Sequence, residues 1–83
     1  MTYTCPVCAF GGMEDPPKDY TICPCCGTEF GYDDHTRSHL ELRNAWLAKG
    51  GRWFSGVTEP PSDWNPYAQL VAAGYEYGVA PVA

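Results

Sequence analysis

The longest regular pattern of hydrophobic and polar positions runs from about Thr36 to Lys49 and has the period of an α-helix. At 100° per residue, one broad arc of this segment collects the large apolar side chains together with His39 and Arg43. Polar and small side chains occupy the other arc. His39 and Arg43 are therefore predicted to face inward. The apolar members of the same arc are Leu40, Leu42, Trp46 and Leu47.

The two ends of this predicted helix carry separate signals. Gly50-Gly51 is typical of a C-terminal stop, because glycine readily takes the left-handed conformation that ends a helix. At the start, Ser38 followed three residues later by Glu41 fits a capping box. Asp34 or Thr36 would instead cap a slightly longer helix, so the sequence leaves the first helical residue open among these positions.

A second, shorter helix is predicted close to the end of the chain. Asn65 is a favourable N-cap, Pro66 suits the first helical position, and Gly74 follows the last turn. The residues after it, 75–79, alternate weakly and predict either a short strand or a frayed end. The apolar stripe of this helix consists of Tyr67, Leu70 and Val71.

Residues 51–65 form an aromatic-rich connection between the two helices, and Trp53, Phe54 and Trp64 are expected to pin it to the longer helix. The chain holds three Trp, six Tyr and three Phe. One small core need not enclose all of them, and surplus aromatic surface favours a protein partner or a second copy of the chain.

The first 33 residues have strand-like segments around two cysteine pairs. Residues 20–22 and 28–32 are rich in residues that favour strands, and both flank the second pair. Residues 13–19 between the pairs form a turn or loop, because Pro16 and Pro17 cannot join a central ladder. A β-hairpin is therefore expected in this part of the chain.

The cysteine pairs read Cys5-Pro6-Val7-Cys8 and Cys23-Pro24-Cys25-Cys26-Gly27, with fourteen residues between them. Two intervening residues let both sulfurs of a pair converge on one ion, and four thiolates suit tetrahedral structural zinc. The pairs overlay with proline in the same place, and Cys25 then falls where Val7 does. The predicted metal ligands are Cys5, Cys8, Cys23 and Cys26; a disulfide framework and other ligand registers stay open.

A closed four-thiolate site leaves no coordination position for water, so the predicted ion is structural and no catalytic residue is assigned. Cys25 is expected to be a spare thiol on the outer lip of its knuckle, or else a reactive one. Ala9 stands where the second knuckle has Gly27, which predicts a less regular first knuckle.

Other polar residues allow further hypotheses. His35 and His39 are four apart, a spacing that suits either a second metal site completed by Asp33, Asp34 and Glu41 or a mere packing and capping role. An inward Arg43 needs a carboxylate or carbonyls; an ion pair with Asp33, Asp34 or Glu29 is the first expectation, and an external anion is the alternative. A small enzyme using His39, Arg43 or Cys25 would require a concave pocket around those side chains.

Length and composition narrow the class of protein. At 83 residues we expect one domain over 1–83, with a knuckle unit in 1–33 and a helical, aromatic-rich part in 34–83 packed on it. A chain this short needs stabilisation beyond its hydrophobic core, and binding of structural zinc contributes about 10–16 kcal/mol to the folding free energy of small peptides. The odd cysteine count favours a reducing compartment, and no leader or membrane-spanning segment is read from the sequence, so a cytoplasmic location is expected.

The charge of the chain disfavours nucleic-acid binding. The formal net charge is −5, and four thiolates around a divalent ion add two further negative charges. A protein that neutralises phosphates needs clustered cations. The five in this chain are scattered: Lys18, Arg37, Arg43, Lys49 and Arg52.

Two resemblances follow from the cysteine motifs. Cys23-Pro24-Cys25-Cys26-Gly27 resembles the second knuckle of rubredoxins, which are one-iron electron carriers, although Cys8-Ala9-Phe10 departs from their first knuckle. The whole cysteine pattern, with Pro60-Pro61 and Trp64-Asn65-Pro66, is similar to small uncharacterised bacterial cysteine-rich proteins of the CPCC type. That resemblance implies a rubredoxin-like or zinc-ribbon metal unit and supplies no catalytic residues.

The predicted fold class is therefore α+β: a small metal-stabilised domain with a zinc-ribbon or rubredoxin-like β-hairpin knuckle unit, followed by one longer and one short helix. The predicted function is a zinc-binding structural domain that serves protein–protein interaction or assembly. The alternative is an iron-binding, rubredoxin-like electron carrier. Enzymatic activity is not expected.

Overall fold

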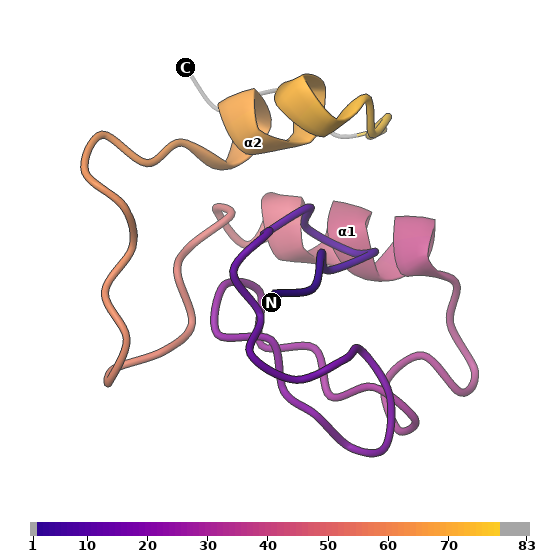
Figure 1. Ribbon diagram of the computed structural model, residues 1–83. Coiled ribbons are helices and arrows are strands. Elements are labelled where there is room, and N and C mark those ends of the chain that lie inside the picture. The colour runs from indigo at the N-terminus through magenta and orange to yellow at the C-terminus, as the bar shows by residue number, and fades with distance from the viewer. Residues whose placement is uncertain (1, 79–83) are drawn as a thin grey trace.

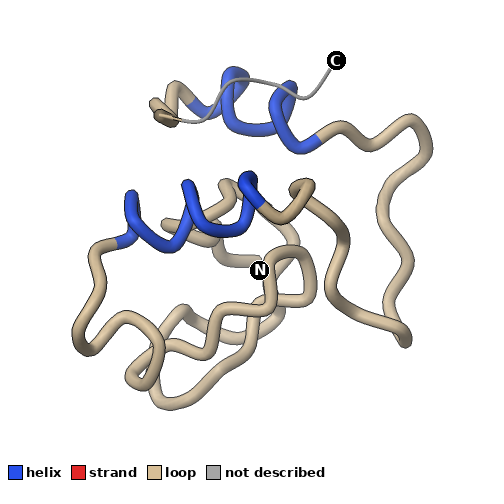
Figure 2. The backbone as a smooth tube through the Cα atoms, turned by 180° about the vertical axis from the view of Figure 1, so that it is seen from behind, coloured by secondary structure: helices blue, strands red, loops and turns tan. Residues whose placement is uncertain are grey.

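A computed structural model describes residues 2–78 of the chain. Within them the helix α1 spans His39–Ala48 and the helix α2 spans Pro66–Ala73. In the view of Figure 1, α2 lies above α1, and much of the non-helical chain that precedes α1 lies below it (Figures 1 and 2). The radius of gyration is 11.8 Å, which equals the value of about 12 Å for a compact domain of this length. No helix in the described part is long and apolar enough to span a membrane.

The helix α1 begins at the shorter of the predicted starts. Ser38 is its N-cap, with Ser38 Oγ accepting from Glu41 N at 3.0 Å and Glu41 Oε1 accepting from Ser38 N at 2.9 Å. Capping by Asp34 is wrong, because Asp34 Oδ1 accepts from Gly31 N at 2.7 Å and so holds the preceding turn instead. The reciprocal bonds of the capping box satisfy two backbone donors at once.

The caps of α2 are as predicted. Asn65 Oδ1 accepts from the backbone N–H groups of Tyr67 at 2.9 Å and Ala68 at 3.0 Å. Pro66 stands at the first helical position, and Gly74 ends the helix with φ 75°. The predicted apolar stripe is only partly right, since Leu70 is fully buried whereas Val71 is 65% exposed.

The tail after α2 folds back along α1 and forms no strand up to residue 78. Gly78 N donates to Asn44 Oδ1 at 2.8 Å, and the Tyr77 ring lies 5.2 Å from that of Tyr67. The predicted weak strand is therefore wrong for 75–78, and residue 79 lies outside the described part. These contacts close one side of the core.

The predicted β-hairpin does not form, and α+β is thus not the observed class: residues 2–78 contain no strand. Two isolated antiparallel bridges, Tyr3–Met13 and Ile22–Glu29, are all that remains of a ladder. Asp19 and Tyr20 both have positive φ in a tight turn closed by Thr21 N donating to Lys18 O at 3.1 Å. Together with the prolines, such turns bend the chain too often for a strand to extend.

The core joins the cysteine knuckles to both helices. Its fully buried apolar side chains come from either part of the chain, and Leu47 of α1 and Leu70 of α2 belong to the same cluster as Val7. On α1, Arg43 is buried as predicted, but His39 and Leu40 are not: the His39 side chain is 44% exposed and Leu40 is 40% exposed. Both lie in the first turn of α1, so the inward face starts later than the periodicity predicted.

The tryptophans form one chain of contacts. The Trp53 ring lies 5.2 Å from Phe10 and 5.4 Å from Trp64, and Trp64 lies 6.3 Å from Trp46 on α1. Trp64 thus holds the connection against α1 as predicted, whereas Trp53 holds it against the first knuckle. Phe54 contacts neither of these places; it is 60% exposed and lies over Gly27.

Candidate metal centre

The fold brings together the four cysteines that the sequence analysis selected. Cys5 Sγ lies 3.8 Å from Cys26 Sγ, and Cys8 Sγ lies 3.6 Å from Cys23 Sγ. All four sulfurs lie within 4.8 Å of one another. A tetrahedral ion with zinc–sulfur bonds of about 2.3 Å separates its ligands by about 3.8 Å. The four sulfurs therefore fit a tetrahedral tetrathiolate site.

The two knuckles share one backbone design. Ala9 N donates to Cys5 O, and Gly27 N donates to Cys23 O, both at 2.9 Å. Ala9 has φ 71° and Gly27 has φ 78°. The expectation of a less regular first knuckle is thus wrong, because Ala9 adopts the left-handed conformation at a cost of about 1–2 kcal/mol.

Polar groups surround the sulfurs in ways that suit thiolates. The N–H groups of Val7 and Cys8 point at Cys5 Sγ at 3.4 and 3.5 Å. The Thr28 hydroxyl lies 3.2 Å from Cys26 Sγ; the neutral thiol donates in this pair, and a thiolate would accept from the hydroxyl. Donors aimed at a sulfur favour its charged form, which is the form that binds metal.

The sulfurs do not ionise independently. Hydrogen bonding, foremost with Cys23, raises the pKa of Cys5 and of Cys8, and burial adds to both. Hydrogen bonding, foremost with Cys26, lowers the pKa of Cys23. Four buried thiolates this close would repel one another, so a cation among them is what allows all four to be charged.

The first knuckle is held by side chains from both helices. Arg43 on α1 donates from Nε to Val7 O at 2.6 Å and from Nη2 to Pro6 O at 2.8 Å. Gln69 on α2 donates from Nε2 to Cys8 O at 2.8 Å. Three successive carbonyls of one turn are thus satisfied by two side chains that are 36 or more residues away in sequence.

Arg43 makes none of the predicted ion pairs. Besides the knuckle carbonyls, its Nη1 donates to Glu76 O at 2.7 Å, and its guanidinium lies 4.7 Å from the centre of the Tyr75 ring. Within residues 2–78 the ion pair that forms is between His39 Nε2 and Asp34 Oδ2, at 3.3 Å. Arg43 is therefore a buried cation held by carbonyls and a ring, with no carboxylate partner among residues 2–78.

The second knuckle is held by the backbone of the aromatic connection. Ser55 N donates to Pro24 O at 2.9 Å, and Phe54 N donates to Cys25 O at 3.0 Å. The Phe54 ring comes so close to Gly27 that a Cβ there would clash with it. Glycine at position 27 is thus favoured both by the positive φ, which Ala9 tolerates in the first knuckle, and by the Phe54 ring.

Cys25 does not lie on the outer lip of the knuckle. Its side chain is fully buried, as is that of Val7 at the matching position of the first knuckle. Gln69 Nε2 lies 3.5 Å from Cys25 Sγ. The pseudo-repeat therefore points Val7 and Cys25 into the core, where Cys25 acts as a small hydrophobic side chain.

The histidines do not form a second metal site. Among residues 2–78 the cysteine tetrad is the group of three or more candidate ligands that converges, and His35 and His39 belong to no other. His39 instead pairs with Asp34, whose pKa is lowered by the Gly31 N–H and further by His39. Cys25, His39 and Arg43, the residues considered for an enzyme, line none of three well-formed cavities found among residues 2–78.

Two functional side chains escaped the sequence analysis. Gln69 and Thr28 contact the cysteine turns, but neither belongs to a recognisable motif. A weak signal existed for Gln69, because it precedes the buried Leu70 and so lies near the inward edge of α2. Thr28 follows Gly27 directly and was interpreted only as a strand residue.

The chain is similar to the uncharacterized protein YoaQ of Bacillus subtilis (strain 168), with 44% identity over a match that covers 58% of this chain and 59% of that protein. The chain thus spans less than two thirds of the length of this relative. No family model matches the chain. No solved structure matches it either.

Proposed function

We propose that the protein is a zinc-binding structural domain in which Cys5, Cys8, Cys23 and Cys26 hold one ion. The carrying observation is the spacing of the four sulfurs, 3.6 and 3.8 Å within two pairs, of which Cys5, Cys8 and Cys23 are fully buried. Arg43 gives independent support, since a buried cation without a carboxylate is compensated by a dianionic tetrathiolate centre next to the turn that it binds. Bound zinc would stabilise the knuckles; it would have no open position for catalysis.

Metal stoichiometry of cysteine variants tests this ligand set. Protein refolded with zinc is expected to hold one ion per chain, and Cys25→Ala is expected to keep it because Cys25 is not a ligand. Cys26→Ala is expected to lose at least tenfold in zinc affinity. Both substitutions remove a thiol from the same turn, so Cys25→Ala controls for the loss of a thiol that is not a proposed ligand. Equal loss in both variants, or no zinc in the wild-type chain, would overturn the ligand set.

We further propose that the domain serves protein–protein interaction. Large side chains remain on the surface around one groove: Tyr20 is 65% exposed and Tyr32 is 69% exposed. The groove encloses about 600 Å³. Tyrosine and arginine are enriched in protein interfaces. Its lining comes from Tyr20, Gly31, Tyr32, Asp33, His35, Thr36 and Arg37.

Binding through the groove is tested with a surface variant. A chain carrying Tyr20→Ser and Tyr32→Ser is expected to fold and bind zinc as the wild type does, but to lose a protein captured from native extract. Phe54→Ser removes an equally exposed ring at another place and is the matched control. Capture that survives the tyrosine changes would contradict the proposed surface, and sedimentation of the purified chain separates a second copy from a foreign partner.

Iron electron transfer is the second candidate. Four thiolates also suit iron, and Cys26 is the one ligand that is not fully buried, which gives an electron a short path to the surface. Aerobically purified iron protein would be red and would bleach reversibly on reduction. A colourless protein with stoichiometric zinc, even from iron-rich medium, would exclude this candidate.

A further inference from the structure

The candidate metal centre is shielded unequally. Cys5, Cys8 and Cys23 are fully buried, whereas Cys26 is partly exposed. The first knuckle is covered by α1 and α2 through Arg43 and Gln69. Among the four cysteines, Cys26 is thus the one nearest to solvent, and neither Arg43 nor Gln69 donates to its turn.

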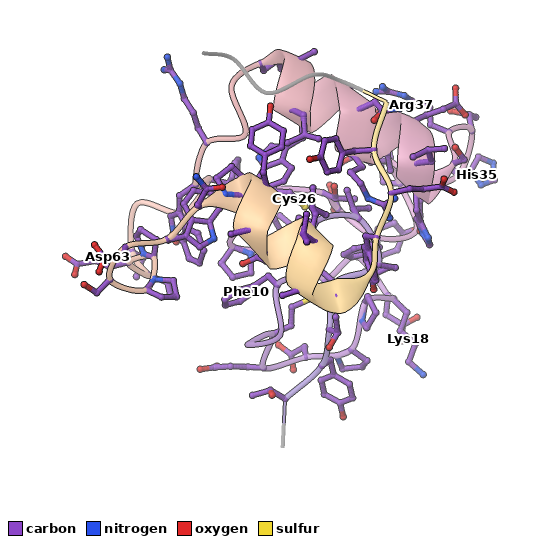
Figure 3. All side chains as sticks on the ribbon, turned by 90° about the horizontal axis from the view of Figure 1, so that it is seen from above. Phe10, Lys18, Cys26, His35, Arg37 and Asp63 are labelled. Carbon is purple, nitrogen blue, oxygen red and sulfur yellow. The ribbon has the colours of Figure 1, made fainter. Side chains whose placement is uncertain are left out.

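A cavity opens beside Cys26. It encloses about 240 Å³ between the second knuckle and α1. Leu42 and Trp46 give it an apolar wall, and Arg37 and Lys49 bring two cations to it. In the view from above, Cys26 lies near the centre of the molecule and Arg37 near the end at which α1 begins (Figure 3). The complete lining is Cys26, Gly27, Thr28, Asp33, Arg37, Leu42, Ala45, Trp46 and Lys49.

The charges of the cavity favour an anion. Its one carboxylate, Asp33, is already engaged, because Asp33 Oδ2 accepts from Glu29 N at 2.8 Å. Arg37 and Lys49 are exposed, and neither forms an ion pair within residues 2–78. The chain as a whole has a net charge of −5, whereas the cavity beside Cys26 carries two cations and one carboxylate and is therefore locally positive. Such a site concentrates anions and speeds their arrival.

We propose that this cavity is the exchange port of the metal centre and accepts anionic metal ligands, namely thiolate or carboxylate groups. This inference rests on the metal-binding function proposed above. With an ion bound, Cys26 would be the ligand that an anionic donor in the cavity could replace. Cys26 would leave with its electron pair as a thiolate, to which the Thr28 hydroxyl would donate. Cys5, Cys8 and Cys23 would keep the ion.

The test compares two chelators on protein that has first been shown to hold one zinc ion. Release to the anionic polycarboxylate EDTA and to a neutral hexadentate pyridine chelator is followed by stopped-flow. A variant with Arg37→Ala and Lys49→Ala is expected to release zinc about tenfold more slowly to EDTA, and at the wild-type rate to the neutral chelator. The loss should shrink at about 1 M salt, where charges are screened within about 3 Å.

A matched control separates a local port from general electrostatics. Lys18→Ala with Arg52→Ala removes the same charge from exposed positions outside the cavity and is expected to leave both rates near the wild-type values. Equal slowing in the two double variants, or equal slowing with both chelators, would overturn the proposed port. A wild-type chain that takes up no zinc would instead overturn the metal-binding function itself.

A steric variant gives a second, independent readout. Ala45 lines the cavity, whereas Ala48 lies on the same helix, is exposed and does not line it. Ala45→Phe is expected to fill the cavity and slow release to both chelators by about fivefold or more, since access then limits exchange. Ala48→Phe is the control and should not change either rate. Unchanged release from Ala45→Phe protein that still binds one zinc would contradict the port.

Discussion

At the scale of single residues, the candidate metal centre is held by side chains outside the cysteine motifs. Arg43 and Gln69 satisfy three carbonyls of the first knuckle, and the aromatic connection satisfies two of the second. Buried carbonyls without partners cost about 1–3 kcal/mol each. The second half of the chain is therefore part of the machinery that holds the cysteines in place.

Replacing Arg43 should be the most damaging change outside the cysteines. Arg43→Met keeps the apolar stem but removes the donors to Pro6, Val7 and Glu76, so we expect the free energy of unfolding of zinc-loaded protein to fall by about 3 kcal/mol or more. Chemical denaturation measures it. Arg37→Met, at an exposed position, should cost little. Similar stability of the Arg43 variant and the wild type would refute the structural role of this guanidinium.

Gly27 offers a test of the second knuckle. Gly27→Ala combines positive φ with a clash against Phe54, and we expect a loss of about 2 kcal/mol or more in the free energy of unfolding. In a Phe54→Ala background the clash is gone, and the loss should shrink to the strain of about 1–2 kcal/mol that Ala9 already sustains. An identical loss in both backgrounds would show that the ring does not confine this turn.

The convergence of the four cysteines could be predicted from the sequence, whereas the residues that hold their turns could not, for a physical reason. Metal ligands must lie two residues apart on a tight turn, so their spacing is visible in the chain itself. The bonds from Arg43 and Gln69 join residues 36 or more positions apart, and no local pattern records them. The same limit explains why the sequence favours a carboxylate partner for Arg43. The carbonyls of Pro6, Val7 and Glu76, to which Arg43 donates, come together only after folding.

At the scale of elements, helix ends were predictable and strands were not. Caps depend on a few neighbouring side chains, and those of α2 were predicted correctly. Strands depend on pairing over several residues. Next to each cysteine turn the pairing stops after a single bridge, Tyr3–Met13 at the first turn and Ile22–Glu29 at the second. Strand-favouring composition near a metal knuckle therefore indicates extended residues rather than a sheet.

The start of α1 can be tested by two alanine substitutions. Ser38→Ala removes the side-chain acceptor for Glu41 N, and we expect a loss of about 1 kcal/mol in the free energy of unfolding. Thr36→Ala changes the alternative cap that the sequence allowed and should cost much less. Thermal denaturation of both variants with zinc present decides between them. A larger loss at Thr36 would place the start of the helix earlier in the chain.

The capping box should also contribute to pH dependence. The Ser38 N–H lowers the pKa of Glu41 in the folded state. The Glu41 carboxylate therefore contributes to stability at pH values above its unfolded-state pKa of about 4.3. This contribution is lost as the pH falls through the lower pKa that Glu41 has in the folded state. Glu41→Gln is expected to be less stable than the wild type near pH 6, and the difference in the free energy of unfolding should shrink as the pH falls toward about 4.5. Urea denaturation measures it at pH values where both proteins still hold one zinc ion. A deficit that widens on acidification would contradict this sign.

At the scale of the whole molecule, the candidate metal centre and the hydrophobic core form one buried cluster. The four cysteines, Val7 and Met13 belong to the same buried cluster as Leu47 and Leu70 of the two helices. No separate core under α1 and α2 is evident in the described part, because the first knuckle supplies the surface on which Arg43 and Gln69 act. The helices are thus expected to depend on the ion as the knuckles do.

Removal of metal should therefore unfold more than the cysteine turns. With zinc contributing about 10–16 kcal/mol in small peptides and small domains having about 5–15 kcal/mol in total, we expect a strong chelator to abolish the helical circular dichroism signal of α1 and α2. Adding zinc back under reducing conditions should restore it. A metal-free chain that keeps its helical signal would show that the helices fold on their own.

The contacting tryptophans Trp46, Trp53 and Trp64 should make intrinsic fluorescence sensitive to the occupancy of the candidate metal centre. Trp64 Nε1 donates to Gln69 Oε1 at 2.9 Å, and Gln69 donates in turn to Cys8 O beside the metal ligands. The indole is therefore two hydrogen bonds away from the first knuckle. Intrinsic fluorescence should shift to the red as the ion leaves, so that occupancy by zinc, which has no colour of its own, can be followed without a dye.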